Sequence, residues 1–176
     1  LTGGVFDATL GARLEELGYD RSFDEIQTSR PADRTRAGSL VVALEPARVR
    51  LEGCGNLDLG GIAKGWIVDR VVAMLAGEGS QAAVVDGGGD IRVVGGPWPI
   101  GYGAGHVAHL ESEAIATSSR TRRRWRDTNG RELHHVLDPG TGDPALAGID
   151  TVTVRASEAS LADALATAML VDAERT

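Results

Sequence analysis

Residues 58–69 combine a double glycine, a lysine and a helical pattern in a way that suits an anionic ligand. Gly60 and Gly61 have no side chains to keep a ligand away from the backbone. The first turn of a helix presents unpaired N–H groups and the positive end of the helix dipole. Lys64 adds a mobile positive charge, so phosphate is the ligand that best suits this stretch. The plainer alternative is a tight turn followed by a surface lysine, and the stretch is not a P-loop, because no Ser or Thr follows Lys64.

Near the other end of the chain, Asp163 and Thr167 stand four residues apart in a helical pattern, so their side chains lie on one face. A carboxylate and a hydroxyl from one helical turn form a partial shell for a hard cation such as Mg²⁺, and the alanines around them let a ligand approach closely. In the alternative, Asp163 caps the helix and Thr167 bonds back to a backbone carbonyl. Spacing alone favours this alternative.

Two adjacent histidines, His134 and His135, lie in a strand pattern. Successive side chains of a strand face opposite sides of the sheet, so only one of the two can belong to a given site. Histidine takes up a proton near neutral pH without help from its surroundings, although most such residues are structural. A phosphate cradle, a cation shell and a base in one small chain together suggest phosphoryl transfer.

Two predicted helices carry Lys64 and the pair of Asp163 and Thr167. One covers residues 62–75 and the other residues 157–173. The buried stripe expected for the first helix consists of Ile62, Trp66, Ile67 and Val71. The stripe expected for the second consists of Leu161, Leu165 and Met169. Within the second helix, Ser160 and Asp163 stand at the spacing of a capping box.

The remaining pattern predicts one further helix and a series of short strands. The helix covers residues 8–17 and ends at Gly18, and the polar residues 20–38 form a mobile connection. The strands are expected over residues 40–44, 49–51, 82–85, 91–94, 114–119, 132–137 and 150–155, with another near Trp125. Pro46 and the Asn129-Gly130 pair mark two hairpin turns.

Glycine and proline mark the main loops. The three glycines within residues 86–90 leave two alternatives open: either a flat ligand or another backbone passes close to this turn, or it is a loose hairpin loop. Residues 95–105 are expected to be a loop with Trp98 tucked under it, and residues 138–144 are a dense turn directly after the histidine strand.

The composition bounds the class of protein. The chain has 176 residues, of which 42% are hydrophobic, enough for one domain with a sizeable core. A formal net charge of −7 argues against general binding of nucleic acid, although the arginines of residues 120–126 form a local basic run. Cys54 is the only cysteine, so no internal disulfide forms. The sequence has no signal segment and no apolar run long enough to cross a membrane.

Five motifs follow one another along the chain. They are Asp58-Leu59-Gly60-Gly61-Ile62-Ala63-Lys64-Gly65, Gly88-Gly89-Asp90-Ile91, Thr117-Ser118, His135-Val136-Leu137-Asp138-Pro139 with Thr141-Gly142 and Pro144, and Ala162-Asp163-Ala164-Leu165-Ala166-Thr167-Ala168. In this order they resemble the bacterial ApbE family of FAD:protein FMN transferases. The resemblance implies an α+β fold of mixed, largely antiparallel sheets packed with a few helices, similar to the T-fold. It also implies a single domain over residues 1–176 that lacks the family's N-terminal segment and C-terminal end.

The activity implied by the resemblance is the Mg²⁺-dependent transfer of FMN from FAD to a Thr or Ser hydroxyl of an acceptor protein, with release of AMP. The partners implied are FAD and an acceptor of the membrane redox subunit type, with no nucleic acid. Two alternatives remain: an FAD pyrophosphatase that yields FMN and AMP, and a flavin-binding protein without turnover. The resemblance further implies an extracytoplasmic location, either periplasmic or lipoprotein-anchored.

The resemblance also suggests roles for single residues. Asp163, Thr167 and the main-chain carbonyl of Ala63 look like the metal ligands. The catalytic residues are then His135, Lys64 and Asp163, with His135 deprotonating the attacking hydroxyl. The residues expected beside the flavin nucleotide are Asp58, Gly60, Gly61, Lys64, Thr117, Ser118 and His135.

Overall fold

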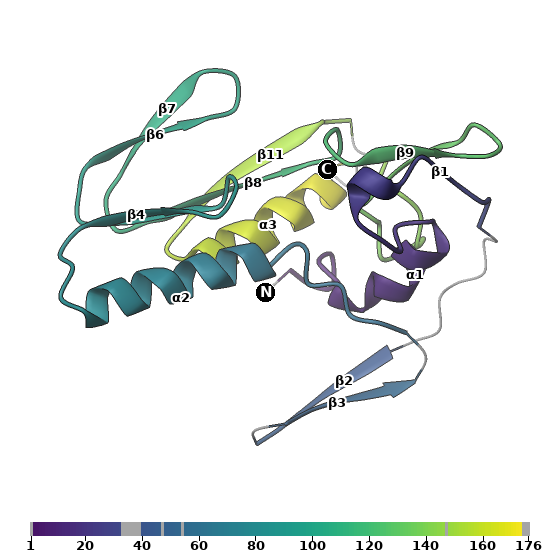
Figure 1. The fold of residues 1–176 in the computed structure, drawn as a ribbon, viewed down its shortest axis with the longest axis horizontal. Helices are drawn as coiled ribbons and strands as arrows, with labels where there is room; N and C mark the ends of the chain where they lie inside the picture. Colours follow the sequence, from purple (N-terminus) through teal and green to yellow (C-terminus); the bar gives the residue numbers. More distant parts are fainter. Residues whose placement is uncertain (1, 33–39, 47, 54, 147, 174–176) are drawn as a thin grey trace. The chain divides into compact units, whose positions relative to one another are not determined.

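The computed structural model describes residues 2–32, 40–46, 48–53, 55–146 and 148–173 (Figure 1). Apart from the first two residues, the chain divides into two compact units. The first is drawn from residues 3–58 and 120–146, and the second from residues 59–119 and 147–176. The single domain expected over residues 1–176 stays a prediction. Within the described ranges, no helix has the length and apolar character needed to cross a bilayer.

The second unit is built on an antiparallel four-stranded sheet with the strand order β11-β8-β5-β4. Its strands are β4 (Ala83–Asp86), β5 (Ile91–Val94), β8 (Ala114–Ser119) and β11 (Thr151–Ala156). Helices α2 (Ala63–Gly77) and α3 (Ala159–Asp172) lie side by side against one face of this sheet (Figure 1). On that face Ala114 packs with Val68 and Ala159. The unit is therefore an α+β structure, as the family resemblance implied.

The other face of the sheet is covered by a hairpin that the sequence analysis missed. Strands β6 (Trp98–Tyr102) and β7 (His106–Leu110) pair antiparallel, and their apolar side chains pack with Val93 and Ile115. The prediction of a loop over residues 95–105 is therefore wrong. Trp98, which was expected to be tucked under that loop, is partly buried in this cluster. Trp98, Ile100 and Tyr102 alternate with period two, but the prolines and glycines between them hid the strand pattern.

The buried faces of α2 and α3 contain many small residues, which the predicted stripes did not include. In α2 the buried residues are Gly65, Val68 and Val72, whereas Trp66 is 58% exposed and Ile67 is 55% exposed. In α3 the alanines are buried, Leu161 and Leu165 are partly buried, and Met169 is 54% exposed. A Cβ atom on Gly65 would lie only 2.3 Å from the Ala159 carbonyl oxygen. The two backbones approach too closely for large side chains between them.

The cap of α3 comes from another helix rather than from a capping box. The Asp69 carboxylate of α2 accepts hydrogen bonds from the backbone N–H groups of Ala159 (2.9 Å) and Ser160 (2.9 Å) and from the Ser160 hydroxyl (2.7 Å). Burial raises the pKa of Asp69, but hydrogen bonds from Arg92, Ser160 and Ala159 outweigh it and leave the pKa below its ordinary value. The expected capping box at Ser160 and Asp163 is wrong, because a tertiary contact satisfies these N–H groups.

The first unit contains short helices and a three-stranded sheet with the order β1-β9-β10. Its elements are η1 (Ala8–Leu10), α1 (Gly11–Glu16), η2 (Phe23–Glu25), β1 (Thr28–Ser29), β9 (Arg124–Asp127) and β10 (Glu132–His134). Leu14, Leu17, Trp125, Leu133 and Leu137 form its core. The helix expected over residues 8–17 is confirmed with a 3₁₀ first turn, and Gly18 follows it with a φ of +97°.

Two further predictions concern the connections of the first unit. The hairpin at Asn129-Gly130 is confirmed by the pairing of β9 with β10, but β10 ends at His134 instead of residue 137. The connection expected over residues 20–38 contains η2 and β1, and residues 33–39 lie outside the described residues.

An antiparallel hairpin also belongs to this unit, formed by β2 (Leu40–Glu45) and β3 (Arg48–Gly53), as expected. Its register places Val42 opposite Leu51 and Leu44 opposite Val49, so these four exposed side chains share one face. On the opposite face, Arg50 forms ion pairs with Glu45 and Glu52. The hairpin is therefore amphipathic, with its apolar face exposed.

Candidate functional site

A lysine and two buried carboxylates meet at the first turn of α2. Lys64 lies in this turn, Asp90 immediately precedes β5, and Asp163 lies in the second turn of α3. The Lys64 Nζ atom is 2.5 Å from Asp90 Oδ2 and 3.2 Å from Asp163 Oδ2. Asp90 is 1% exposed and Asp163 is 2% exposed. Three elements far apart in the sequence thus converge on one charged cluster.

The electrostatics of this cluster favour additional positive charge. Burial raises the pKa of Asp163 to about 6; the Lys64 ammonium opposes the rise, and the neighbouring Asp90 carboxylate adds to it. Two carboxylates and one ammonium carry a net charge of −1 when all three are ionised. Buried charges in proteins are normally paired or bound to a metal, so the remaining negative charge is suited to a cation.

Asp163 does not cap its own helix, which removes the alternative that spacing alone favoured. Its carboxylate faces Lys64, and the Gly65 N–H group lies 3.5 Å from Asp163 Oδ2. The first turn of α2, which begins at Ala63, therefore lies directly against this carboxylate. Ala63 and Asp163, both expected to bind the metal, come from elements that are in contact.

Thr167 lies one turn beyond Asp163 and bonds to a side chain of the sheet. Its Oγ1 atom is 2.8 Å from Ser118 Oγ on β8. Thr117 faces the opposite side of the sheet, where its hydroxyl is 2.9 Å from that of Thr153. The structure therefore brings Ser118, Thr167 and Asp163 to the helix-covered face and places Thr117 on the other face. The expectation that Thr117 and Ser118 both lie beside the nucleotide stays a prediction.

The double glycine before α2 forms a tight turn. The N–H groups of Ile62 and Ala63 both donate to the Leu59 carbonyl, at 3.0 and 2.8 Å. These two donors are engaged within the turn, and Lys64 is engaged by two carboxylates. Binding of an anion by Gly60, Gly61 and Lys64 stays a prediction.

The three-glycine turn between β4 and β5 is ordered by Asp86. The N–H groups of Gly88 and Gly89 donate to Asp86 Oδ1 at 2.9 and 2.8 Å, and both glycines have positive φ angles. A Cβ atom on Gly87 would lie 2.6 Å from the Val68 side chain of α2. Hypothetical Cβ atoms on Gly88 and Gly89 meet no described neighbour within 4 Å, so the two alternatives for this turn stay open.

Asp90 is the functional candidate to which the sequence analysis gave no role. In the sequence, Asp90 stands out only as a member of the glycine-rich turn and of the motif at residues 88–91. A carboxylate directly after a glycine turn and directly before a strand was the available signal, since such a position fixes the side chain at the end of a sheet.

The remaining predicted residues, Asp58 and His135, belong to the first unit. The Asp58 N–H group donates to the Ala8 carbonyl at 2.8 Å. His135 directly follows β10, and its ring centroid is 6.4 Å from that of Tyr19. His134 is buried, and its Nε2–H donates to the Ala145 carbonyl at 3.1 Å. The two histidines are therefore in different environments, and the roles expected of Asp58 and His135 stay predictions.

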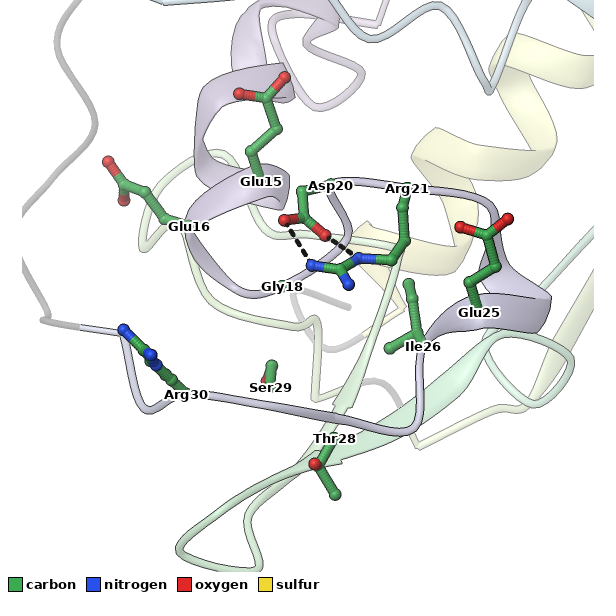
Figure 2. A pocket seen from close by; sticks show the side chains of 10 residues that line it. All are labelled: Glu15, Glu16, Gly18, Asp20, Arg21, Glu25, Ile26, Thr28, Ser29 and Arg30. Carbon is green, nitrogen blue, oxygen red and sulfur yellow. Dashed lines mark hydrogen bonds and ion pairs between the residues drawn. The ribbon is translucent and has the colours of Figure 1, made fainter.

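A hollow of about 450 Å³ in the first unit contains none of the predicted residues (Figure 2). Its lining is mostly charged and includes Glu15, Glu16, Asp20, Glu25, Arg21 and Arg30. Arg21 pairs with Asp20 through two hydrogen bonds of 2.7 and 3.0 Å, which Figure 2 shows. This hollow supplies no arrangement for phosphoryl transfer.

The fold and the charged cluster define an α+β protein with a candidate cation site between two helices and a sheet. Comparison with known proteins identifies the family: the model of the ApbE family matches residues 1–175, so the chain belongs to the ApbE family.

Similar proteins agree with this assignment. The chain is 32% identical to an FAD:protein FMN transferase of Treponema pallidum, over 97% of this chain and 55% of the relative. It is 31% identical to one of Rhodobacter capsulatus, over 97% of this chain and 36% of the relative. The crystal structure of an ApbE protein of Thermotoga maritima matches with a TM-score of 0.79 and 33% identity, over 98% of this chain and 61% of that chain. The chain thus spans about half the length, or less, of these curated relatives.

The residues present fit a magnesium ion. Mg²⁺ prefers hard oxygen ligands, and the expected set consists of the Asp163 carboxylate, the Thr167 hydroxyl and the Ala63 carbonyl. In the described part of the chain, no group of three or more His, Cys, Asp or Glu side chains is arranged to hold a metal. The expected set contains only one carboxylate and would not form such a group, so the two observations are compatible.

Proposed function

We propose that this chain carries out the Mg²⁺-dependent transfer of FMN from FAD to a Thr or Ser hydroxyl of an acceptor protein, releasing AMP. The observation that carries the proposal is the buried cluster of Lys64, Asp90 and Asp163, next to the hydroxyl pair of Thr167 and Ser118, in a chain of the ApbE family. Relatives that match this chain are named FAD:protein FMN transferase.

In the proposed reaction the acceptor hydroxyl oxygen forms a bond to the phosphorus of the FMN moiety. The bond from that phosphorus to the bridging oxygen breaks, and AMP leaves with that oxygen. His135 takes the hydroxyl proton. Asp163, Thr167 and the Ala63 carbonyl would hold Mg²⁺, which supplies positive charge against the pyrophosphate. Lys64 and the turn at Gly60 and Gly61 bind the nucleotide phosphates.

The direct test incubates the chain with FAD, Mg²⁺ and a candidate acceptor protein. The expected result is flavin fluorescence on the acceptor that survives a denaturing gel, together with one AMP per flavin transferred, and EDTA abolishes both. AMP and FMN without labelled acceptor would show an FAD pyrophosphatase instead. FAD binding without any product at any Mg²⁺ concentration would contradict the proposal and favour a flavin-binding protein.

We also propose that the acceptor is a redox subunit of the membrane and that the reaction takes place outside the cytoplasm, with the enzyme periplasmic or lipoprotein-anchored. Both statements extend what the resemblance to the ApbE family implies. Fractionation of cells that express the complete protein, followed by detection of labelled acceptors in each fraction, tests them. Labelled acceptors confined to the cytoplasm would contradict both.

A further inference from the structure

Asp90 and Asp163 share one ammonium unequally. The Lys64 Nζ atom lies 2.5 Å from the nearer oxygen of Asp90, but 3.2 and 3.4 Å from the two oxygens of Asp163. Within the described part of the chain, neither carboxylate has another cationic partner. Lys64 is therefore held mainly by Asp90 and only partly by Asp163.

This arrangement matters for a cation at Asp163 because the lysine and the cation compete for the same carboxylate. An ammonium that paired fully with Asp163 would neutralise it and repel a divalent ion. As long as Asp90 holds the ammonium, the cluster keeps a net charge of −1, and this charge resides on Asp163. The attraction between unlike charges is strong at such buried positions, because little water screens it.

We infer that Asp90 is a positioning residue of the cation site, which holds Lys64 and so keeps Asp163 available to Mg²⁺. This inference rests on the proposed function, in which Asp163 binds the metal. It assigns Asp90 a role through Lys64 rather than through contact with substrate, and it predicts opposite effects for the two residues.

Three variants separate this role from a merely structural one. Asp90→Asn leaves Lys64 and Asp163 to pair fully, with a net charge of zero, and should weaken Mg²⁺ binding about tenfold or more. Lys64→Met leaves two carboxylates, with a net charge of −2, and should tighten Mg²⁺ binding. The double variant Asp90→Asn with Lys64→Met restores the net charge of −1 and should bring Mg²⁺ affinity back toward that of the unchanged chain. A residue with only a packing role would show no such rescue.

The probe is MgCl₂ alone, without FAD, at constant ionic strength. Mg²⁺ affinity is measured by isothermal titration calorimetry and by the rise of the melting temperature with Mg²⁺ concentration. Glu113→Gln is the matched control, because Glu113 is a carboxylate of the same unit that pairs with Arg155 and lies outside the cluster. This control should leave Mg²⁺ affinity unchanged. If Asp90→Asn does not fold, Lys64→Met and the double variant still carry the test.

Equal Mg²⁺ affinity in the unchanged chain and in Asp90→Asn would overturn the inference, and so would a double variant as weak as Asp90→Asn. Absence of saturable Mg²⁺ binding by the unchanged chain would overturn it as well. The proposed function is judged by a different measurement, the flavin-transfer assay. If the unchanged chain transfers flavin but Asp90→Asn binds Mg²⁺ with the same affinity, only the role of Asp90 is refuted. The expected pattern of affinities without flavin transfer refutes only the transferase activity.

Discussion

Asp163 and His134 are both buried, but their surroundings give them different roles. Asp163 faces an ammonium and a second carboxylate, next to the turn that contains Ala63. His134 donates one hydrogen bond to a backbone carbonyl, and its Nδ1 atom has no hydrogen-bond partner among the described residues. Asp163 is the proposed cation ligand, whereas the contacts of His134 are structural.

This difference predicts how activity depends on Mg²⁺ in two alanine variants. Asp163→Ala should raise the Mg²⁺ concentration needed for half-maximal FMN transfer by about tenfold or more, because a charged ligand is lost. His134→Ala should leave that concentration nearly unchanged while lowering stability. Titration of the transfer assay with MgCl₂ gives both values. Equal shifts in the two variants would mean that the metal ligand is assigned wrongly.

His134 should also make the stability of the chain depend on pH. Burial lowers the pKa of His134 below its ordinary value, and the positive charges of Arg120 and Arg124 add to this effect, against the hydrogen bond to Ala145 and the charge of Glu132. The unfolded chain therefore gains a proton near the ordinary histidine pKa, whereas the folded chain remains neutral to lower pH. The free energy of unfolding should fall as the pH drops through about 6.5.

Chemical denaturation between about pH 7.5 and 5.5 tests this prediction. The variant His134→Gln should lose stability less steeply over this range than the unchanged chain. The other three histidines are present in both proteins and cancel in the comparison. An equal or steeper slope in the variant would show that His134 is not the residue responsible.

At the scale of helices and strands, the contact of α2 with α3 is sensitive to side-chain size. A Cβ atom on Gly65 would lie 2.3 Å from the Ala159 carbonyl oxygen and 2.6 Å from the Ser160 nitrogen, and backbone atoms cannot move aside cheaply. Gly65→Ala should therefore cost about 1–3 kcal/mol of stability. It should also weaken Mg²⁺ binding, because the helices that carry Lys64 and Asp163 must separate.

Gly77→Ala is the matched control for this prediction. Gly77 is the last residue of the same helix, and among the described residues no atom beyond its own helical segment lies within 4 Å of the Cβ position. Alanine there should be neutral or stabilising by about 0.5–1 kcal/mol, since glycine is the poorer helix former. Urea denaturation of both variants provides the comparison, and a Gly65→Ala variant as stable as Gly77→Ala would refute the close approach.

The sequence predicted the elements of the molecule better than their buried faces. Most strands and all three α-helices were expected close to their observed positions, because periodicity and turn residues act locally. The predictions of the buried faces of α2 and α3 were wrong, because both helices have apolar residues on several sides. Only the partner decides that Gly65 and the alanines pack inward while Trp66 stays exposed.

The candidate site shows, at the scale of the whole chain, that local sequence patterns do not determine which residues meet in the folded protein. Motif order was enough to identify the family, and it put Asp163, Thr167 and Lys64 forward as candidate site residues. It could not show that Ser118 and Thr117 face opposite sides of the sheet, because strand register was unknown. Nor could it show that Asp90 pairs with Lys64, since these residues are 26 positions apart and meet only in the folded chain.

The cap that Asp69 places on α3 links the candidate site to the integrity of α2. Glu158, at the N-cap position, makes no side-chain cap hydrogen bond, so the first turn of α3 relies on a carboxylate from α2. A local opening of α2 would therefore expose the first amides of α3 to hydrogen exchange and loosen the turn that holds Asp163. The two helices are expected to unfold together as one cooperative segment, so the residues proposed to bind the cation share a single lifetime in the native state.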